Sequence, residues 1–347
     1  DLQGSLPATD FVAWYNGHPD FRDYDVDLSQ ESVAVVGVGN VAMDVARILC
    51  RTPEELAVTD IADYALEKLR NSNVKKVYIL GRRGPAQAAF TTPEIKELGE
   101  MEDTDAYVEP EEAVLDPLSE ASLADSSDRA TVKKVEVIQS YAGRPSSGKS
   151  RRLTLRFLVS PVELIGNDEG QIVKMRIVKN KLYKTDAGSL RPKATEETEE
   201  IPVGLVFRAI GYRGVPIPDV PFYDSWGVIL NKQGRVIDPE TQKPVLGEYT
   251  GGWIKRGPSG VIGTNKPDAL ETVQQMLADV ASGQVLSPEC PDAQAASHFI
   301  AEKQPDYFSY DDWLKLDALE VANGKAQGRP RVKFTSVADM LTAVGKR

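Results

Sequence analysis

The fold is decided by the stretch SVAVVGVGNVAMDVARILC, which spans residues 32–50. It opens with the continuous apolar run Ser32–Val36, which is typical of a strand buried on both faces of a parallel sheet. Apolar residues then recur at helical spacing over residues 41–51, and Pro53 ends that helix. The stretch therefore predicts a buried strand, a tight glycine turn and a helix in direct succession.

The turn between this strand and this helix, Gly37 to Ala42, matches the pattern G-x-G-x-x-G/A. Gly37 permits the tight turn, Gly39 lets the backbone approach a pyrophosphate, and Ala42 is small enough for close helix–strand packing. The helix start offers unpaired N–H groups and a positive dipole end to phosphates. The pattern therefore predicts dinucleotide binding, and the alternative is a tight strand–helix turn without a ligand.

The next predicted strand, residues 74–80, indicates which dinucleotide binds. An NAD site usually places Asp or Glu at this strand end, whereas here Arg82 and Arg83 follow directly. Two guanidinium groups suit a 2′-phosphate, so the site is predicted to bind NADP. Arg82 lies 45 residues after Gly37, farther than usual, and a second helix over residues 60–69 accounts for the added length. The alternative for both arginines is solvated surface charge.

The rest of the chain predicts an antiparallel insert and a second domain. Residues 101–128 are acidic and are expected as loops with one short helix, and residues 194–200 as an acidic turn. The expected strands of the insert are residues 133–140, 152–159 and 172–183. After another apolar run and a Pro- and Gly-rich stretch, an amphipathic helix is predicted over residues 269–282, with Asp268 and Glu271 in its N-cap pattern. One or two surface helices are expected over residues 288–347.

The composition excludes several classes of protein. The 347 residues suggest two or three domains, and 41% hydrophobic with 27% charged residues argues against a disordered chain. No apolar stretch approaches eighteen residues, and residues 1–7 do not resemble a signal peptide. The net charge of −11 argues against general nucleic-acid binding. Two cysteines and two histidines, without ligand spacing, exclude a disulfide framework and a four-ligand zinc site.

Four blocks of the sequence resemble the adrenodoxin reductase family, and they occur in the family's order. They are FVAWYNG at residues 11–17, GNVAMDVARIL at 39–49, GRRGPAQAAFT at 81–91 and GWIKRGPSGVIGTN at 252–265. This family transfers electrons from NADPH through FAD to a ferredoxin- or adrenodoxin-type iron–sulfur protein. The resemblance implies an α/β, glutathione-reductase-like architecture. Residues 1–212 would form a Rossmann-like NADP-binding domain with the antiparallel insert, and residues 213–347 the carboxy-terminal part of an FAD-binding domain.

The resemblance also implies a role for individual residues. Glu94 would lie near the NADP ribose, and Glu97, the one catalytic candidate, near the nicotinamide, where it would orient the carboxamide or relay a proton. The alternative for these two glutamates is a solvated helix face, and for Trp253 it is a core aromatic at a strand end. Arg82 and Arg83 match the 2′-phosphate pair. The residues that match the pyrophosphate loop are Val38, Gly39, Asn40 and Val41, and those that match the flavin contacts are Trp253, Gly260, Val261 and Ile262.

The sequence departs from the family in one respect. Family members begin with another strand–GxGxxG–helix unit that holds the ADP half of FAD, and no such motif precedes Phe11. We therefore expect a chain that lacks the amino-terminal FAD-binding portion, either as a fragment or as a chain completed by a partner.

Three hypotheses about function follow. The first is an NADPH–ferredoxin reductase that uses FAD and NADP, expected as a monomer in the cytoplasm or, alternatively, the mitochondrial matrix. The second is a related flavoprotein, such as a glutamate synthase small subunit or a disulfide-reductase relative, although the latter would carry a CxxC pair, which is absent. The third is an NADP-binding module without turnover. An acidic ferredoxin would need a basic docking face, for which Lys96, Lys255 and Lys266 are the candidates.

Overall fold

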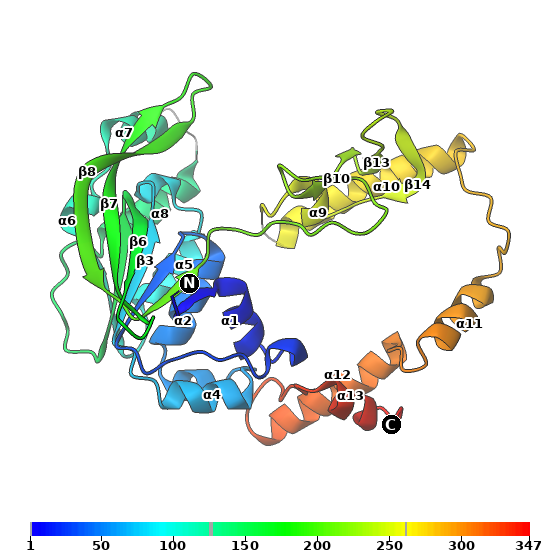
Figure 1. The fold of residues 1–347 in the computed structure, drawn as a ribbon, viewed down its shortest axis with the longest axis horizontal. Helices are drawn as coiled ribbons and strands as arrows, with labels where there is room; N and C mark the ends of the chain where they lie inside the picture. Colours follow the sequence, from blue (N-terminus) through cyan, green and yellow to red (C-terminus); the bar gives the residue numbers. More distant parts are fainter. Residues whose placement is uncertain (1, 125–127, 261) are drawn as a thin grey trace. The chain divides into compact units, whose positions relative to one another are not determined.

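The computed structural model describes residues 2–124, 128–260 and 262–347, with the side chain of Ile262 left out. It divides into two compact units, one formed by Asp1–Ile210 with Phe308–Arg347 and the other by Gly211–Tyr307 (Figure 1). The domain boundary predicted from the sequence, after residue 212, lies two residues beyond the observed division after Ile210. No described helix is both long and apolar enough to cross a membrane.

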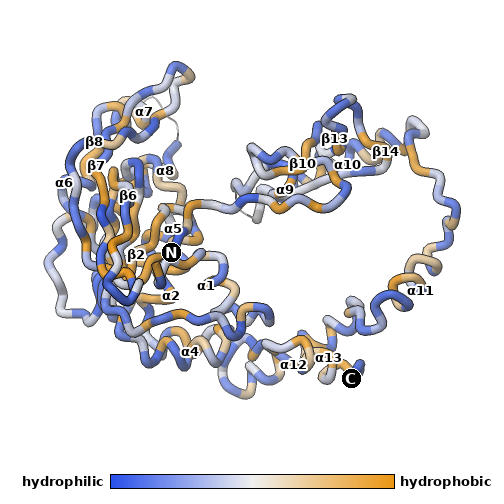
Figure 2. Tube along the Cα trace, in the orientation of Figure 1, coloured by the Kyte–Doolittle hydropathy of each residue, from blue (hydrophilic) through white to orange (hydrophobic). Residues whose placement is uncertain are grey.

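The first unit is built on a six-stranded sheet in the order β1-β9-β2-β3-β5-β4, and all of its strand pairs are parallel. The predicted strand of residues 32–36 is confirmed as β2, and Val33, Ala34 and Val35 are buried because helices cover one face of the sheet and the antiparallel insert covers the other. The hydrophobic colouring of Figure 2 follows these strands. The bounds are β1 Ser5–Pro7, β2 Ser32–Val36, β3 Lys76–Gly81, β4 Thr104–Val108, β5 Arg151–Phe157 and β9 Leu205–Arg208.

Helices pack against this sheet and complete its core. The predicted helix after the glycine turn is confirmed as α2, and Ala42 is fully buried in it. An aromatic cluster joins α1 to β9, since the rings of Phe11 and Phe207 lie 4.5 Å apart between centroids. The elements are α1 Ala8–Tyr15, η1 Pro19–Phe21, α2 Asn40–Cys50, α3 Pro53–Ala57, α4 Asp63–Arg70, η2 Pro85–Gln87, α5 Thr92–Gly99, α6 Pro110–Ala113, α7 Pro117–Ala124 and α8 Arg129–Gln139.

The antiparallel insert is confirmed, but two of the three strands predicted for it are not part of it. It consists of β6 Val159–Gly166, β7 Ile172–Lys184 and β8 Leu190–Pro202. The prediction of a strand over residues 133–140 was wrong: Asp128 caps helix α8 there by accepting from the N–H groups of Ala130 and Thr131, 3.1 Å each. Residues 151–157 belong to the parallel sheet as β5.

The acidic residues 194–200 form part of β8 rather than a turn. Their carboxylates pair with basic side chains of the neighbouring strand, as in Arg176–Glu200 at 2.8 Å and Lys179–Glu197 at 3.6 Å. Opposite charges on facing strands stabilise the pairing, so an acidic run is compatible with an extended strand here.

The carboxy-terminal residues 308–347 belong to the first unit. They contain α12 Tyr310–Ala326 and α13 Val337–Ala343. The buried Arg329 attaches this segment by donating to the carbonyls of Thr59, at 2.9 Å, and Ile61, and by pairing with Asp63. The structure therefore groups residues 308–347 with the first unit, whereas the sequence analysis placed them in one domain with residues 213–307.

The second unit combines short strands with one long helix. Its helix α10 begins four residues earlier than predicted, and the predicted capping role of Asp268 and Glu271 was wrong, because both carboxylates bind Lys255 instead. Arg235 and Tyr249 hold this helix by donating to Asp279, 2.7 Å each. The elements are β10 Phe222–Tyr223, β11 Val228–Ile229, β12 Asn231–Lys232, β13 Arg235–Ile237, β14 Pro244–Tyr249, α9 Trp253–Arg256, η3 Ile262–Thr264, α10 Asn265–Ala281 and α11 Ala293–Lys303.

Candidate functional site

The glycine turn after β2 has the geometry that phosphate binding requires. Gly37 has a φ of +133°, and a Cβ there would lie 2.2 Å from the carbonyl oxygen of Ala209, so only glycine fits. Helix α2 then begins with Gly39 as its N-cap, which provides no side chain to cap the first N–H groups. A Cβ at Gly39 would meet no atom of the described residues within 4 Å. The turn thus leaves open space in front of an uncapped helix end.

Two of the family-like blocks meet at this turn. The carbonyl of Val38 accepts from the N–H groups of Ala89, at 2.8 Å, and Phe90, at 3.1 Å. The side chain of Asn40 accepts from the N–H of Thr91 at 3.1 Å. The loop of residues 38–41 is therefore bound directly to the segment that follows Arg82 and Arg83, and both lie where β2 and β3 end.

The arginine pair is held by its main chain, and neither guanidinium group forms an ion pair with the described residues. The carbonyl of Arg82 accepts from the buried amide of Asn180 at 3.0 Å, and that of Arg83 from the N–H of Leu158 at 3.1 Å. Burial, followed by the positive charges of Arg82 and Arg191, lowers the pKa of the Arg83 guanidinium. Arg191 on β8 is therefore a third arginine near this pair. Neither it nor Asn180 was predicted from the sequence, because both reach this place only through the pairing of β7 and β8.

Glu94 and Glu97 on α5 form a cluster of ion pairs with α2. Arg47 binds Glu94, and its Nε lies 3.0 Å from the carboxylate of Glu97. Arg47 also binds Asp44 at 2.5 Å, and Arg51 binds Glu97. The two carboxylates are partly exposed but paired, and their most direct effect is to fix α5 against the phosphate-binding helix.

The flavin-like segment lies in the second unit and is open to solvent at its aromatic residue. Trp253 begins α9 and is 45% exposed, so the alternative of a core aromatic at a strand end is wrong. Its ring lies 5.5 Å from that of Tyr212, centroid to centroid, an aromatic neighbour that the sequence did not reveal. Gly260 has a φ of +82°. Val261 lies outside the described residues, and Ile262 is described by its backbone alone, as the start of η3.

The sequence suggested that Lys255 is an exposed cation available for docking, but the structure differs. Lys255 is buried, and its Nζ lies 3.1 Å from Asp268 and 2.7 Å from Glu271. It therefore fixes α9 to α10 and is withdrawn as a docking residue. The other two candidates, Lys96 and Lys266, are exposed.

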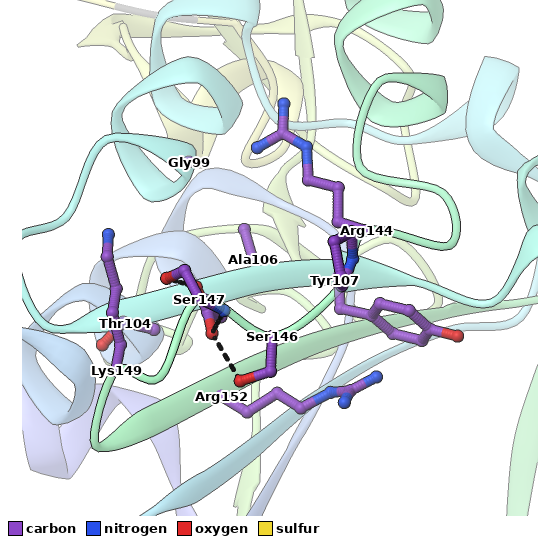
Figure 3. Close-up of a pocket in the computed structure, with 11 residues that line it drawn as sticks. Gly99, Thr104, Ala106, Tyr107, Arg144, Ser146, Ser147, Lys149 and Arg152 are labelled. Carbon is purple, nitrogen blue, oxygen red and sulfur yellow. Dashed lines mark hydrogen bonds between the residues drawn. The ribbon is translucent and has the colours of Figure 1, made fainter.

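A separate hollow of about 260 Å³ lies between β4 and the loop of residues 144–149 (Figure 3). Its acid, Asp105, already accepts from the hydroxyls of Ser146, at 3.1 Å, and Ser147, at 2.6 Å. The hollow includes Thr104 and Arg152, at the amino ends of β4 and β5. Ligands of such sheets bind at the carboxyl ends, so we assign this hollow no part in dinucleotide binding.

Comparison with known proteins gives close relatives over almost the whole chain, although no family model matches it. NADPH-ferredoxin reductase FprA of Mycobacterium leprae is 42% identical over 342 residues, which are 98% of this chain and 73% of that protein. The mitochondrial NADPH:adrenodoxin oxidoreductase of Bos taurus is 38% identical over 354 residues, 99% of this chain and 70% of that protein.

The structural comparison agrees. Mycobacterium tuberculosis FprA in complex with NADPH superposes with a TM-score of 0.89 at 41% identity, and the match covers 99% of this chain and 74% of that one. The predicted fold class is confirmed by this match. The matched shares do not support the further expectation of a missing amino-terminal FAD-binding portion, because they give how much of each relative is matched and not which part.

Proposed function

Because the chain belongs to the family of NADPH–ferredoxin and NADPH–adrenodoxin reductases, we propose that it passes electrons from NADPH through FAD to a ferredoxin-type iron–sulfur protein. The observation that carries this proposal is the loop at the end of β2. There, open space above Gly39, an uncapped helix start and the pair Arg82–Arg83 lie together. A dinucleotide with a 2′-phosphate has a pyrophosphate that fits the helix start and a 2′-phosphate that fits the arginine pair.

We assign the NADPH contacts from this geometry. Backbone N–H groups at the start of α2, residues 39–41, bind the pyrophosphate, because no side chain caps them in the part of the chain that the structure describes. Arg82 and Arg83 bind the 2′-phosphate through charge-assisted hydrogen bonds. The preference for NADPH over NADH follows from this second contact, since NADH has a hydroxyl in place of the phosphate.

The residues of the second unit fit a flavin. Gly252 and Gly257 have positive φ values of 75° and 84°, and a Cβ at either would meet none of the described atoms within 4 Å, which leaves the backbone open to a flat ring. Trp253 beside them is the exposed aromatic contact. We propose that this segment, with Gly260 and the residues 261 and 262 next to it, contacts the flavin.

When bound, NADPH supplies a hydride to FAD, which then delivers electrons singly. The chain's own residues bind the two cofactors and orient them relative to each other. Glu94 and Glu97 hold α5 against α2 through Arg47, and we assign Glu97 the orientation of the carboxamide rather than proton relay, because its carboxylate already accepts from two guanidinium groups.

For the iron–sulfur partner we propose that two exposed cations contribute to docking, Lys96 of the first unit and Lys266 of the second, each within its own unit. The chain carries a net charge of −11, and an acidic partner would be repelled by most of its surface. Local cations at the cofactor segments would offset this repulsion at encounter. The monomeric state and the cytoplasmic location stay predictions.

The test is an anaerobic experiment with protein that has been incubated with FAD and freed of excess flavin. If the absorbance shows bound FAD, NADPH should bleach it faster than NADH does, and oxidised ferredoxin should then restore the colour. Bound flavin that NADPH does not reduce would refute the proposal. Protein that binds NADPH but holds no FAD would favour the NADP-binding module instead.

A further inference from the structure

A polar pocket of about 480 Å³ opens beside Arg83. It is lined by the turn after β3, by helices α7 and α8, and by the tip of the β7–β8 hairpin, which Figure 1 shows next to α7. Its polar lining includes Arg83, Gln87, Ser119, Thr131, Ser189 and Arg191. A pocket with two arginines and several hydroxyls has the donors that an anion requires.

Three arginines lie together at this pocket. Arg82, Arg83 and Arg191 form no ion pair with any carboxylate of residues 2–124, 128–260 and 262–347, and they lie close enough together for the charges of Arg82 and Arg191 to act on Arg83. Among the described residues of the lining the acid is Asp128, which is engaged as the cap of α8 and accepts from the hydroxyl of Thr131 at 2.6 Å. In a chain with a net charge of −11, three arginines that lie together without a carboxylate partner among the described residues indicate a place for an external anion.

The sheet that carries Arg191 is fixed to the arginine turn. Asn180 on β7 donates to the carbonyl of Arg82 at 3.0 Å. Three residues farther along the same strand, Tyr183 pairs with Arg191 on β8. At the other end of β8, Glu199 binds the buried Arg156 of β5 at 2.7 Å. Arg191 is thus placed by a braced hairpin and not by a free loop.

We propose that Arg191 is a third ligand of the 2′-phosphate and a determinant of the selectivity for NADPH over NADH. This inference rests on the proposed function, because it assumes that the arginine turn binds the 2′-phosphate. A phosphate monoester has three terminal oxygens and carries close to two negative charges, so a third guanidinium finds both an acceptor and a charge to neutralise. The antiparallel insert then contributes to cofactor choice as well as to the fold.

The test compares two probes that lack the nicotinamide, so it needs no flavin and no turnover. Calorimetry measures the binding of adenosine 2′,5′-bisphosphate and of 5′-AMP to wild type, Arg191→Gln and Lys181→Gln. Lys181 lies on the same hairpin and does not line the pocket, so its variant removes the same charge without the contact. We expect Arg191→Gln to weaken the bisphosphate about tenfold, the size of one charge-assisted hydrogen bond. 5′-AMP should bind unchanged, and Lys181→Gln should stay within about twofold of wild type.

Each other outcome has a definite meaning. Unchanged bisphosphate binding by Arg191→Gln overturns the inference while leaving the proposed function intact. An equal loss for both probes, or an equal loss in Lys181→Gln, also overturns it, since the effect would then not be specific to the 2′-phosphate or to the pocket. A wild type that binds both probes equally would instead refute the NADP assignment of the proposed function. Because Arg191 is exposed, its variant is expected to fold, which thermal melts of the three proteins check.

Discussion

Gly37 and Gly39 lie two residues apart in the phosphate-binding turn, yet the same substitution is expected to act differently at each. At Gly39 the backbone is extended, with φ −104° and ψ 175°, a conformation that alanine also adopts. At Gly37, φ is +133° and an added Cβ would lie 2.2 Å from the carbonyl oxygen of Ala209. Gly39→Ala should therefore affect the ligand, and Gly37→Ala should affect the fold.

The sizes of both effects follow from this geometry. For Gly39→Ala we expect a change in the free energy of unfolding of less than about 1 kcal/mol, since a smaller unfolded-state entropy offsets the poorer N-cap. Its methyl group would occupy the space of the pyrophosphate and displace two charge-assisted hydrogen bonds of roughly 1.5 kcal/mol each, so NADPH should bind about a hundredfold more weakly. For Gly37→Ala, backbone strain and the clash should cost at least about 3 kcal/mol of stability.

The assays are urea unfolding followed by circular dichroism, and calorimetric titration with NADPH. Gly37→Ala is the matched control, because it adds the same methyl group to the same turn. A folded Gly39→Ala variant that binds NADPH within about threefold of wild type would refute the assignment of this turn to the pyrophosphate.

Three further predictions concern single side chains. Burial raises the pKa of the Cys50 thiol to about 12, whereas Cys290 is exposed, so a thiol reagent should modify one cysteine in the folded protein and the second only after unfolding. Lys255→Met leaves the buried carboxylate of Asp268 with only the more distant Arg256, 3.7 Å away, and should cost about 2 kcal/mol of stability, whereas the exposed Lys266→Met should change stability by less than about 0.5 kcal/mol in the same urea assay. Hydrogen bonds from its arginine and tyrosine neighbours lower the pKa of Asp279 from 3.8 to about 2, so its ionised form stabilises the fold above about pH 4. Asp279→Asn should therefore lower the urea midpoint near neutral pH, and a gap that does not close as the pH falls from about 4 to 2 would contradict this account.

The sequence predicted best where local signals are complete. In residues 32–50, a buried apolar run, a glycine turn and helical spacing all agree, and β2 and α2 have nearly the predicted bounds. Helix α8 was mistaken for a strand because its β-branched residues suggested alternation. The decisive signals were the cap at Asp128 and the spacing of the buried Val135 and Ile138 on one helix face. Strand β4 was missed because it lies in an acidic stretch and is buried on alternate residues only.

The site was predictable where its residues are neighbours in the sequence, as in the glycine turn and the arginine pair. Arg191 and Asn180 were not, because the pairing of β7 with β8 brings them to this turn from far along the chain. The sequence shows that Lys255 carries a charge but not that two carboxylates bury it. Tertiary pairing decides such cases, and composition and periodicity do not encode it.

We propose above all that the end of the parallel sheet binds NADPH through its 2′-phosphate. The most direct test is the ratio of NADPH to NADH affinity, measured by calorimetry for wild type and for Arg82→Ala with Arg83→Ala. At about 1.5–3 kcal/mol for each lost phosphate contact, NADPH binding should fall by tenfold to several hundredfold in the double variant, while NADH binding stays nearly unchanged and the ratio falls by the same factor. An equal fall for both nucleotides, or a wild type without preference, would contradict the claim.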